Sequence, residues 1–269
     1  MKISYIVYSL SASLLISGCN QQPRHPQADL ITQSSATAMT DKTIRILADS
    51  IDANLDHLEK QSSLVYLQGE QSMYAERYSS NGKAILYVEQ KDNGLINSST
   101  KKYYFKNDSL IMVQESNKSN NEYTDTRVFL RNNIAFSKEQ RKGNSASALL
   151  TQPYLSLKSI KDNSIKEDDY QQNIRTWDEA IAGTNQYEMW FDQYIDIPGE
   201  NIIQLKSKAQ NGFTASILVK EPDAFTDSLK ALPGNFKNEK LNFKWKVEDK
   251  EAVYVPVAAR VTSARGLNK

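Results

Sequence analysis

Two different hydrophobic periods divide this chain. From residue 41 to residue 60, apolar side chains recur at intervals of three and four residues, and acidic side chains occupy the opposite side. This spacing predicts an amphipathic helix over Asp41–Lys60, and its apolar stripe consists of Ile44, Leu47, Ala48, Ile51, Leu55 and Leu58. After Ser62 the period changes to two, which is typical of strands with one buried face.

A β-meander is indicated by three similar segments that follow one another at regular intervals. Each has an aromatic strand end, a short turn with asparagine and an apolar strand start; they are Tyr78–Ile85, Tyr104–Ile111 and Phe129–Ile134. The Asn81-Gly82 pair is a strong hairpin signal, because both turn positions need a positive φ. We therefore expect an antiparallel meander from Leu64 to Lys138, with residues 90–99 and 116–124 as exposed polar loops.

The second half of the chain repeats both periods. Apolar residues on one face predict a second helix that stops at Gly183; they are Tyr170, Ile174, Trp177 and Ile181. Alternating apolar residues then predict strands at 187–197, 203–205, 215–219, 241–247 and 253–257, with a short helix near 224–232 between the third and fourth strands. In the fourth strand the alternating residues are Leu241, Phe243, Trp245 and Val247.

The order of these elements is compatible with a small closed barrel, and equally with a sandwich or an extended sheet. The expected fold is mainly β (α+β): a helix and meander domain over 41–145, and over 146–269 a second helix with a small, barrel- or sandwich-like β-rich domain.

The beginning of the chain has the features of a secretory leader. Lys2 precedes the apolar segment Ile3–Ile16, which is shorter than the roughly 20 residues that span a bilayer. The segment ends in Ser17-Gly18-Cys19, and Cys19 is the only cysteine. This ending resembles the lipobox of bacterial lipoproteins, a type II signal peptide. The alternatives are an ordinary secretory leader and a buried apolar strand with an incidental cysteine.

The resemblance covers only the leader, and what it implies concerns processing. It implies cleavage between Gly18 and Cys19, a signal peptide over 1–18 and a diacylglycerol on the Cys19 thiol. Each buried methylene adds about 0.8 kcal/mol, so two or three acyl chains make a stable membrane anchor. In this class Asn20 favours sorting to the outer membrane, here on its periplasmic face. Residues 19–40, rich in Gln, Pro, Ser and Thr, then form a flexible lipidated tether.

Composition and charge limit the classes of partner. The chain has 33 Lys and Arg against 32 Asp and Glu, a net charge of +1, with no basic stripe. Because nucleic-acid binding needs a patch that neutralises phosphates, no nucleic-acid partner is expected. The expected partners are the membrane, through the lipid on Cys19, and an envelope protein, glycan or lipid.

Residues for catalysis are few. His25 lies in the tether and His57 on the polar face of the first helix, and no cluster has metal-ligand spacing. Ser80 and Lys83 match Ser-x-x-Lys formally, but they straddle a predicted turn rather than start a helix. We expect no catalytic residues, metal or cofactor, and a non-catalytic binding or structural role in the envelope.

Two other functions stay open. The order of a helix followed by a meander is similar to the half-barrel of periplasmic lipoprotein carriers, so a carrier of a hydrophobic ligand is the alternative. A hydrolase that relies on His57 or on carboxylates ranks third.

One aromatic pair is a candidate binding surface. Trp190 and Tyr194 have the opposite parity to Met189 and Phe191, so one pair faces the core and the other faces outward. An exposed ledge of Trp190 and Tyr194 suits a glycan, a lipid or a partner protein. Alternatively, the second helix covers this face.

Overall fold

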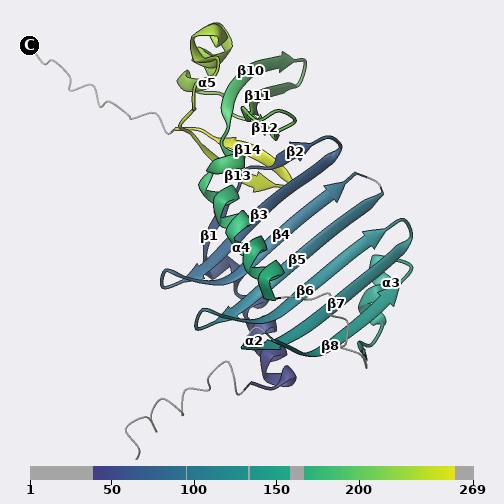
Figure 1. Ribbon diagram of the computed structural model, residues 1–269. Helices are drawn as coiled ribbons and strands as arrows, with labels where there is room; N and C mark the ends of the chain where they lie inside the picture. Colours follow the sequence, from purple (N-terminus) through teal and green to yellow (C-terminus); the bar gives the residue numbers. More distant parts are fainter. Residues whose placement is uncertain (1–38, 95, 133, 158–166, 258–269) are drawn as a thin grey trace, which may run out of the picture. The chain divides into compact units, whose positions relative to one another are not determined.

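The computed structural model describes residues 39–94, 96–132, 134–157 and 167–257, all within one compact unit (Figure 1). The helices are α2 (Asp41–Ala53), α3 (Ala146–Thr151), α4 (Glu167–Ala182) and α5 (Ala224–Ala231), with 3-10 turns η2 (Leu55–His57), η3 (Asn185–Tyr187) and η4 (Pro233–Phe236). The first strands are β1 (Glu59–Ser62), β2 (Tyr66–Gln68), β3 (Gln71–Ser80), β4 (Lys83–Asn93), β5 (Asn97–Lys106), β6 (Ser109–Ser119) and β7 (Glu122–Arg131). The remaining strands are β8 (Ile134–Gly143), β9 (Leu155–Ser156), β10 (Trp190–Ile197), β11 (Glu200–Lys206), β12 (Thr214–Leu218), β13 (Lys244–Glu248) and β14 (Glu251–Val255).

The fold is mainly β, as predicted, and its strands form one open 14-stranded sheet. Strands β3 to β8 pair with their neighbours in chain order, so the predicted meander is confirmed. The predicted turns also occur: Asn81 and Gly82 have φ values of 52° and 75°, and Asn107 and Asp108 have values of 50° and 62°. Asparagine and glycine tolerate this left-handed region, which explains why they mark the hairpins.

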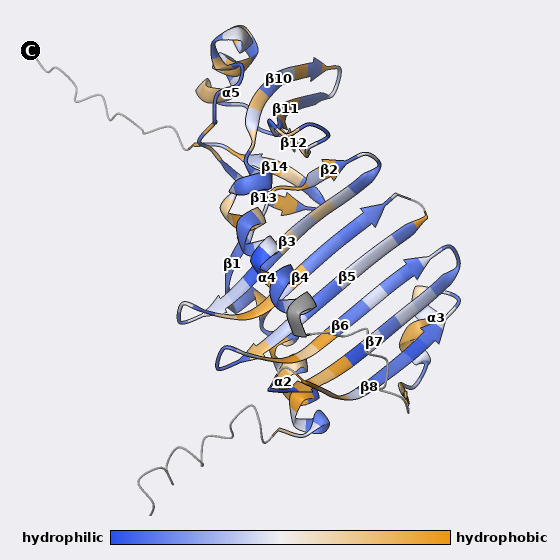
Figure 2. Cartoon of the chain, in the orientation of Figure 1, coloured by the Kyte–Doolittle hydropathy of each residue, from blue (hydrophilic) through white to orange (hydrophobic). Residues whose placement is uncertain are grey.

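The polar loops predicted at 90–99 and 116–124 are instead largely strand. β4 continues to Asn93 and β5 begins at Asn97, and β6 continues to Ser119 while β7 begins at Glu122. These outer strand halves pair through their backbones and carry polar side chains on both faces. For example, the Thr100 hydroxyl donates to Gln90 Oε1 at 2.7 Å. Figure 2 shows apolar strand ends near α2 and hydrophilic ends on the far side.

Helix α2 is shorter than the predicted helix. Thr40 caps it by accepting the Thr43 N–H at 3.2 Å, and it ends at Ala53 rather than at Lys60. The 3-10 turn η2 follows, and Glu59–Ser62 then pairs with β3 as strand β1. Backbone pairing with β3 thus replaces the last helical turn, which the apolar spacing alone did not reveal.

Helices α2 and α4 pack on opposite faces of the sheet (Figure 1). The consecutive residues Tyr103 and Tyr104 show this division, because side chains alternate along a strand. Tyr104 belongs to the cluster under α2, and its hydroxyl donates to Asp52 of that helix at 2.9 Å. Tyr103 belongs to the cluster under α4 and accepts a long hydrogen bond from Asn173 at 3.4 Å.

The C-terminal strands extend the meander's sheet instead of closing a barrel. β10, β11 and β12 are antiparallel neighbours, and β12 also pairs with β2 of the meander. After α5 the chain returns as β14, parallel to β12, with β13 on its outer side. The predicted barrel-like second domain is therefore wrong, because the pairing of β12 with β2 leaves the sheet open. The sheet is not interrupted at the predicted boundary between residues 145 and 146.

The sheet forks beside β2. Strands β1 and β2 lie end to end along the same edge of β3, separated by residues 63–65. The other side of β2 pairs with the start of β12, and β14 pairs with the end of β12. Consequently β1 stays with the meander while β13 and β14 belong to the other branch, and the two branches diverge from β2.

Candidate functional site

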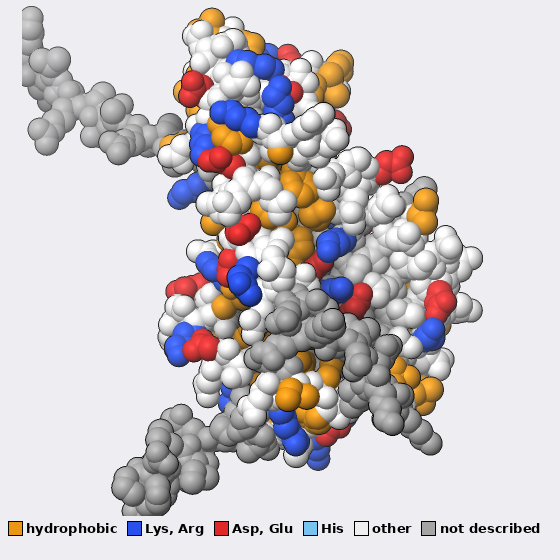
Figure 3. All heavy atoms as spheres, viewed as in Figure 1, with side chains coloured by type: hydrophobic (Ala, Val, Ile, Leu, Met, Phe, Trp, Pro, Cys, Tyr) orange, Lys and Arg blue, Asp and Glu red, His pale blue; other side chains and the backbone are white. Residues whose placement is uncertain are grey.

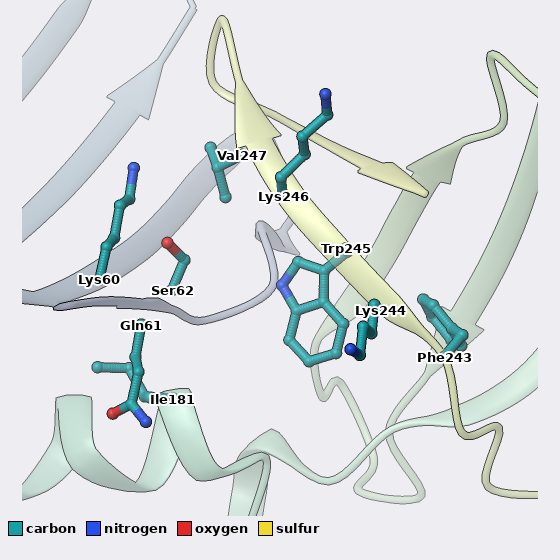
Figure 4. A pocket seen from close by; sticks show the side chains of 9 residues that line it. All are labelled: Lys60, Gln61, Ser62, Ile181, Phe243, Lys244, Trp245, Lys246 and Val247. Carbon is teal, nitrogen blue, oxygen red and sulfur yellow. The ribbon is translucent and has the colours of Figure 1, made fainter. Parts of the chain in front are cut away.

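A cleft of about 450 Å³ lies in the fork, between β1 and β13 (Figure 4). Its volume is within the range of ligand-binding clefts. The lining combines three consecutive residues of β1, a run of five ending in β13 and one residue of α4, namely Lys60, Gln61, Ser62, Phe243, Lys244, Trp245, Lys246, Val247 and Ile181. We call this site the fork cleft.

Ser63 builds the end of the fork cleft at which the branches meet. Its backbone N–H donates to the Ala75 carbonyl at 2.8 Å, and its hydroxyl accepts the Ala75 N–H at 2.9 Å. The Ser63 hydroxyl thereby replaces the Ser63 carbonyl as the acceptor of the Ala75 N–H in the ladder with β3. The Ser63 carbonyl instead accepts the indole N–H of Trp245 at 3.2 Å. One buried serine therefore lets an edge strand of the meander bind a side chain of the other branch.

The apolar part of the cleft comes from alternate residues of one strand. Phe243, Trp245 and Val247 share a parity, and the Phe243 and Trp245 rings meet edge to face with centroids 5.9 Å apart. All three are only partly buried, and Ile181 from the last turn of α4 also lines the cleft. The sequence alternation predicted a strand here, but it gave no signal that three of its four alternating apolar residues line an open cleft.

The charged part of the cleft lining consists of lysines alone. Lys60 forms an ion pair with Glu76 at 2.7 Å and Lys246 with Glu248 at 2.6 Å, and neither glutamate lines the cleft. Within the described ranges, Lys244 has no ion pair. On the face seen in Figure 3, cationic and anionic side chains are otherwise interspersed. Two of the three lysines are thus already paired, and Lys244, between the two aromatic residues of the lining in the sequence, is the unpaired cation of the lining among the described residues.

Helix α4 is held beside the cleft by a buried carboxylate. Glu89 Oε2 accepts the Trp177 indole N–H at 3.0 Å and the Tyr103 hydroxyl at 2.9 Å, and Lys91 forms an ion pair with Glu89. Trp177 precedes Ile181 by one helical turn. Anchoring of Trp177 therefore fixes the position of Ile181 in the cleft wall.

The predicted aromatic ledge does not form. A β-bulge between Phe191 and Gln193 shifts the parity of β10, so Tyr194 pairs across from buried Ile203 and packs against the core. Trp190 lies on the other face, and Lys208 and Lys240 lie over its ring, with their Nζ atoms 4.2 Å and 5.3 Å from the centroid. The extra residue of the bulge separates the two rings, which strict alternation had placed together.

The other candidates from the sequence remain apart. Cys19 and Gly18 lie outside the described residues. His57 is exposed in η2, and Ser80 and Lys83 face each other across the β3–β4 turn, where Lys83 pairs with Asp108 at 3.3 Å.

Carboxylates of β10 are paired with lysines. Asp192 forms ion pairs with Lys206 and Lys237, and hydrogen bonds from these two lysines lower the pKa of its carboxyl. Among the described residues, no group of three or more His, Cys, Asp or Glu side chains has the geometry to hold a metal ion. No helix in the same part of the chain has the length and apolar character to cross a membrane.

Comparison of the chain with protein-family models, curated proteins and solved structures finds no match.

Proposed function

We propose that this protein is a non-catalytic binding protein of a bacterial envelope, anchored by a lipid on Cys19, and that it holds its partner in the fork cleft. The observation that carries the binding role is the juxtaposition of two diverging strands, exposed aromatic surface and three lysines in one cleft. Such a combination of apolar surface with a few polar groups is typical of binding sites. Lipidation at Cys19 rests on the lipobox resemblance and places the body close to a membrane.

The packing under α4 favours this proposal over a carrier of acyl chains. A carrier of the half-barrel type holds its ligand between the sheet and the covering helices. Here that space is filled beside the C-terminal half of α4, because Trp177 is 3% exposed, Ala180 1% and Tyr103 0%. Beside the N-terminal half of α4, a pocket of only about 290 Å³ lies between the helix and Phe105 and Leu110 of the sheet. The fork cleft, by contrast, is open and lies outside this packed layer.

The lipid anchor is tested by metabolic labelling. In bacteria that express the full chain and take up a palmitate analogue, we expect the wild-type protein to be labelled and Cys19→Ser to be unlabelled, since the thiol is the attachment atom. Equal labelling of the two proteins would contradict the anchor. Abundance of both proteins is compared by immunoblot, so that loss of protein is not mistaken for loss of lipid.

The binding role is tested by photo-crosslinking in living cells. We expect a photoreactive residue in place of Lys244 to give a discrete adduct, because this side chain is exposed and lines the cleft. The matched control replaces Lys42, an equally exposed lysine of α2 away from the cleft. Identical adduct patterns from the two positions would remove the fork cleft as the binding site.

A further inference from the structure

The fork leaves two strand edges without a backbone partner. Within the described part of the chain, β1 pairs only with β3, and β13 pairs only with β14. Consecutive residues of both strands line the cleft, so its walls include the edges themselves and not only one row of side chains. In Figure 4 Gln61 points toward α4, whereas Lys60 and Ser62 point to the other side of β1.

The register shows which backbone groups of β1 face the cleft. Ser63 N–H donates to Ala75 O, and the register continues from this pair with Ser62 opposite Glu76 and Gln61 opposite Arg77. In an antiparallel ladder, successive residues direct their backbone groups alternately toward the partner and away from it. Gln61 therefore bonds to β3, and the N–H and C=O groups of Lys60 and Ser62 face the cleft.

These groups suit the addition of a strand. A peptide in extended conformation satisfies unpaired edge groups with its own backbone and places alternate side chains in neighbouring pockets. The partly buried rings of Phe243 and Trp245 offer such a pocket. Lys244, which has no ion pair among the described residues, favours an acidic side chain on the bound strand.

We infer that the fork cleft binds an extended, acidic segment of another protein, which adds as a strand to the edge of β1 and faces β13. This inference rests on the proposed binding role of the cleft and specifies its partner. The C-terminal residues 258–269 of the same chain are a poor occupant by charge. They contain Arg260, Arg265 and Lys269 and no Asp or Glu side chain.

The experiment selects short random peptides on the purified full chain and measures the affinity of the enriched sequences. We expect enrichment of peptides that alternate acidic with apolar residues. N-methylation of alternate backbone amides, in the register that removes the donors to β1, should weaken binding about tenfold, since two hydrogen bonds are lost. N-methylation in the other register leaves those donors intact and serves as the control.

Two variants of the protein test the same site from the other side. Ser62→Pro removes an N–H that faces the cleft and leaves the ladder with β3 intact, so proline is tolerated at this edge position. It should weaken peptide binding about tenfold. Lys244→Glu should weaken binding of acidic peptides about fivefold, whereas Lys42→Glu should not change it. If Ser62→Pro fails to fold, Lys244→Glu and the N-methylated peptides still decide the question.

The outcomes separate the inference from the proposed function. Strand addition is supported if peptides N-methylated in the donor-removing register bind the protein more weakly, and if the unmodified acidic peptides bind Lys244→Glu more weakly than the wild type. Equal binding of both N-methylated registers would overturn it, as would an absence of enriched peptides. Binding of laurate or of phosphatidylglycerol vesicles would also overturn it if that binding were tighter than binding of the enriched peptides and were lost in Lys244→Glu. This result would identify an anionic lipid as the occupant. In each of these cases a discrete crosslink from position 244 still supports the binding role of the cleft.

Discussion

Trp177→Ala should lower the free energy of unfolding by about 3 to 5 kcal/mol, the cost of truncating a large buried aromatic side chain. Trp177 is 3% exposed and lies between α4 and the sheet. Its removal leaves a cavity and takes one hydrogen-bond donor from the buried carboxylate of Glu89. Chemical denaturation of the full chain, followed by far-ultraviolet circular dichroism, measures the change.

Two controls separate packing from hydrogen bonding. Trp177→Phe keeps an aromatic ring and loses the indole N–H, so we expect a loss of about 1 to 3 kcal/mol, typical of a hydrogen bond to a charged group. Gln172→Ala alters an exposed position of the same helix and should change stability by less than about 0.5 kcal/mol. A loss below about 1 kcal/mol for Trp177→Ala would show that α4 is not anchored through this residue.

The same variant connects stability to the fork cleft. Ile181 is one turn beyond Trp177 and lines the cleft wall. Loosening of α4 should therefore weaken peptide binding in Trp177→Ala even under conditions in which the protein stays folded. Gln172→Ala should bind as the wild type does.

The meander could be predicted from the sequence because its signals are local. Asn81-Gly82 and the other asparagine turns specify hairpins within a few residues, and the flanking apolar residues specify the buried face. The outer strand halves around Asn93 and Ser119 lack that apolar signal. They are strands because backbone pairing continues along both neighbours, which is a property of the whole sheet and not of the segment.

Long-range pairing also explains the errors in the second half. The strands β10 to β14 were predicted close to their observed positions, but the partner of β12 lies in β2, far away in the sequence. Neither segment contains a local signal that favours this pairing over the strand pairing of a closed barrel. A bulge of one residue at Phe191 likewise escaped the alternation rule and separated Trp190 from Tyr194. The fork cleft depends on both branches at once, so its residues had no signature beyond the alternation of Phe243, Trp245 and Val247.

Tyrosine hydroxyls hold both helices to the sheet, and they make the fold sensitive to alkaline pH. Tyr104 donates to Asp52 of α2, Tyr87 to Asp178 of α4 at 2.8 Å, and Tyr66 to the Ala180 carbonyl of α4 at 2.9 Å. Burial raises the pKa of Tyr87 to about 12, with a further contribution from its hydrogen bond to Asp178. Burial also raises the pKa of Tyr66, Tyr103 and Tyr104, and nearby carboxylates add to this for Tyr103 and Tyr104.

Stability should therefore fall steeply above about pH 10, the pKa of an unperturbed tyrosine. Below that pH the hydroxyls are protonated in both states, and their contribution to stability is fully present. Above it, the unfolded chain loses protons that the folded protein retains, so each of the four tyrosines costs about 1.4 kcal/mol per pH unit. Together they cost about 5 to 6 kcal/mol per pH unit, which should unfold a domain of ordinary stability within about two units.

The tyrosinate absorbance of the wild type in excess of that of the double variant Tyr103→Phe/Tyr104→Phe should appear together with the loss of the circular dichroism signal, because these two hydroxyls ionise only when the fold opens. The double variant lacks two of the titrating groups. Its stability should depend on pH less steeply, by about 3 kcal/mol per pH unit. An unchanged slope in this variant, or an absorbance difference between wild type and variant that appears before the circular dichroism signal is lost, would show that these hydroxyls are not protected between the helices and the sheet.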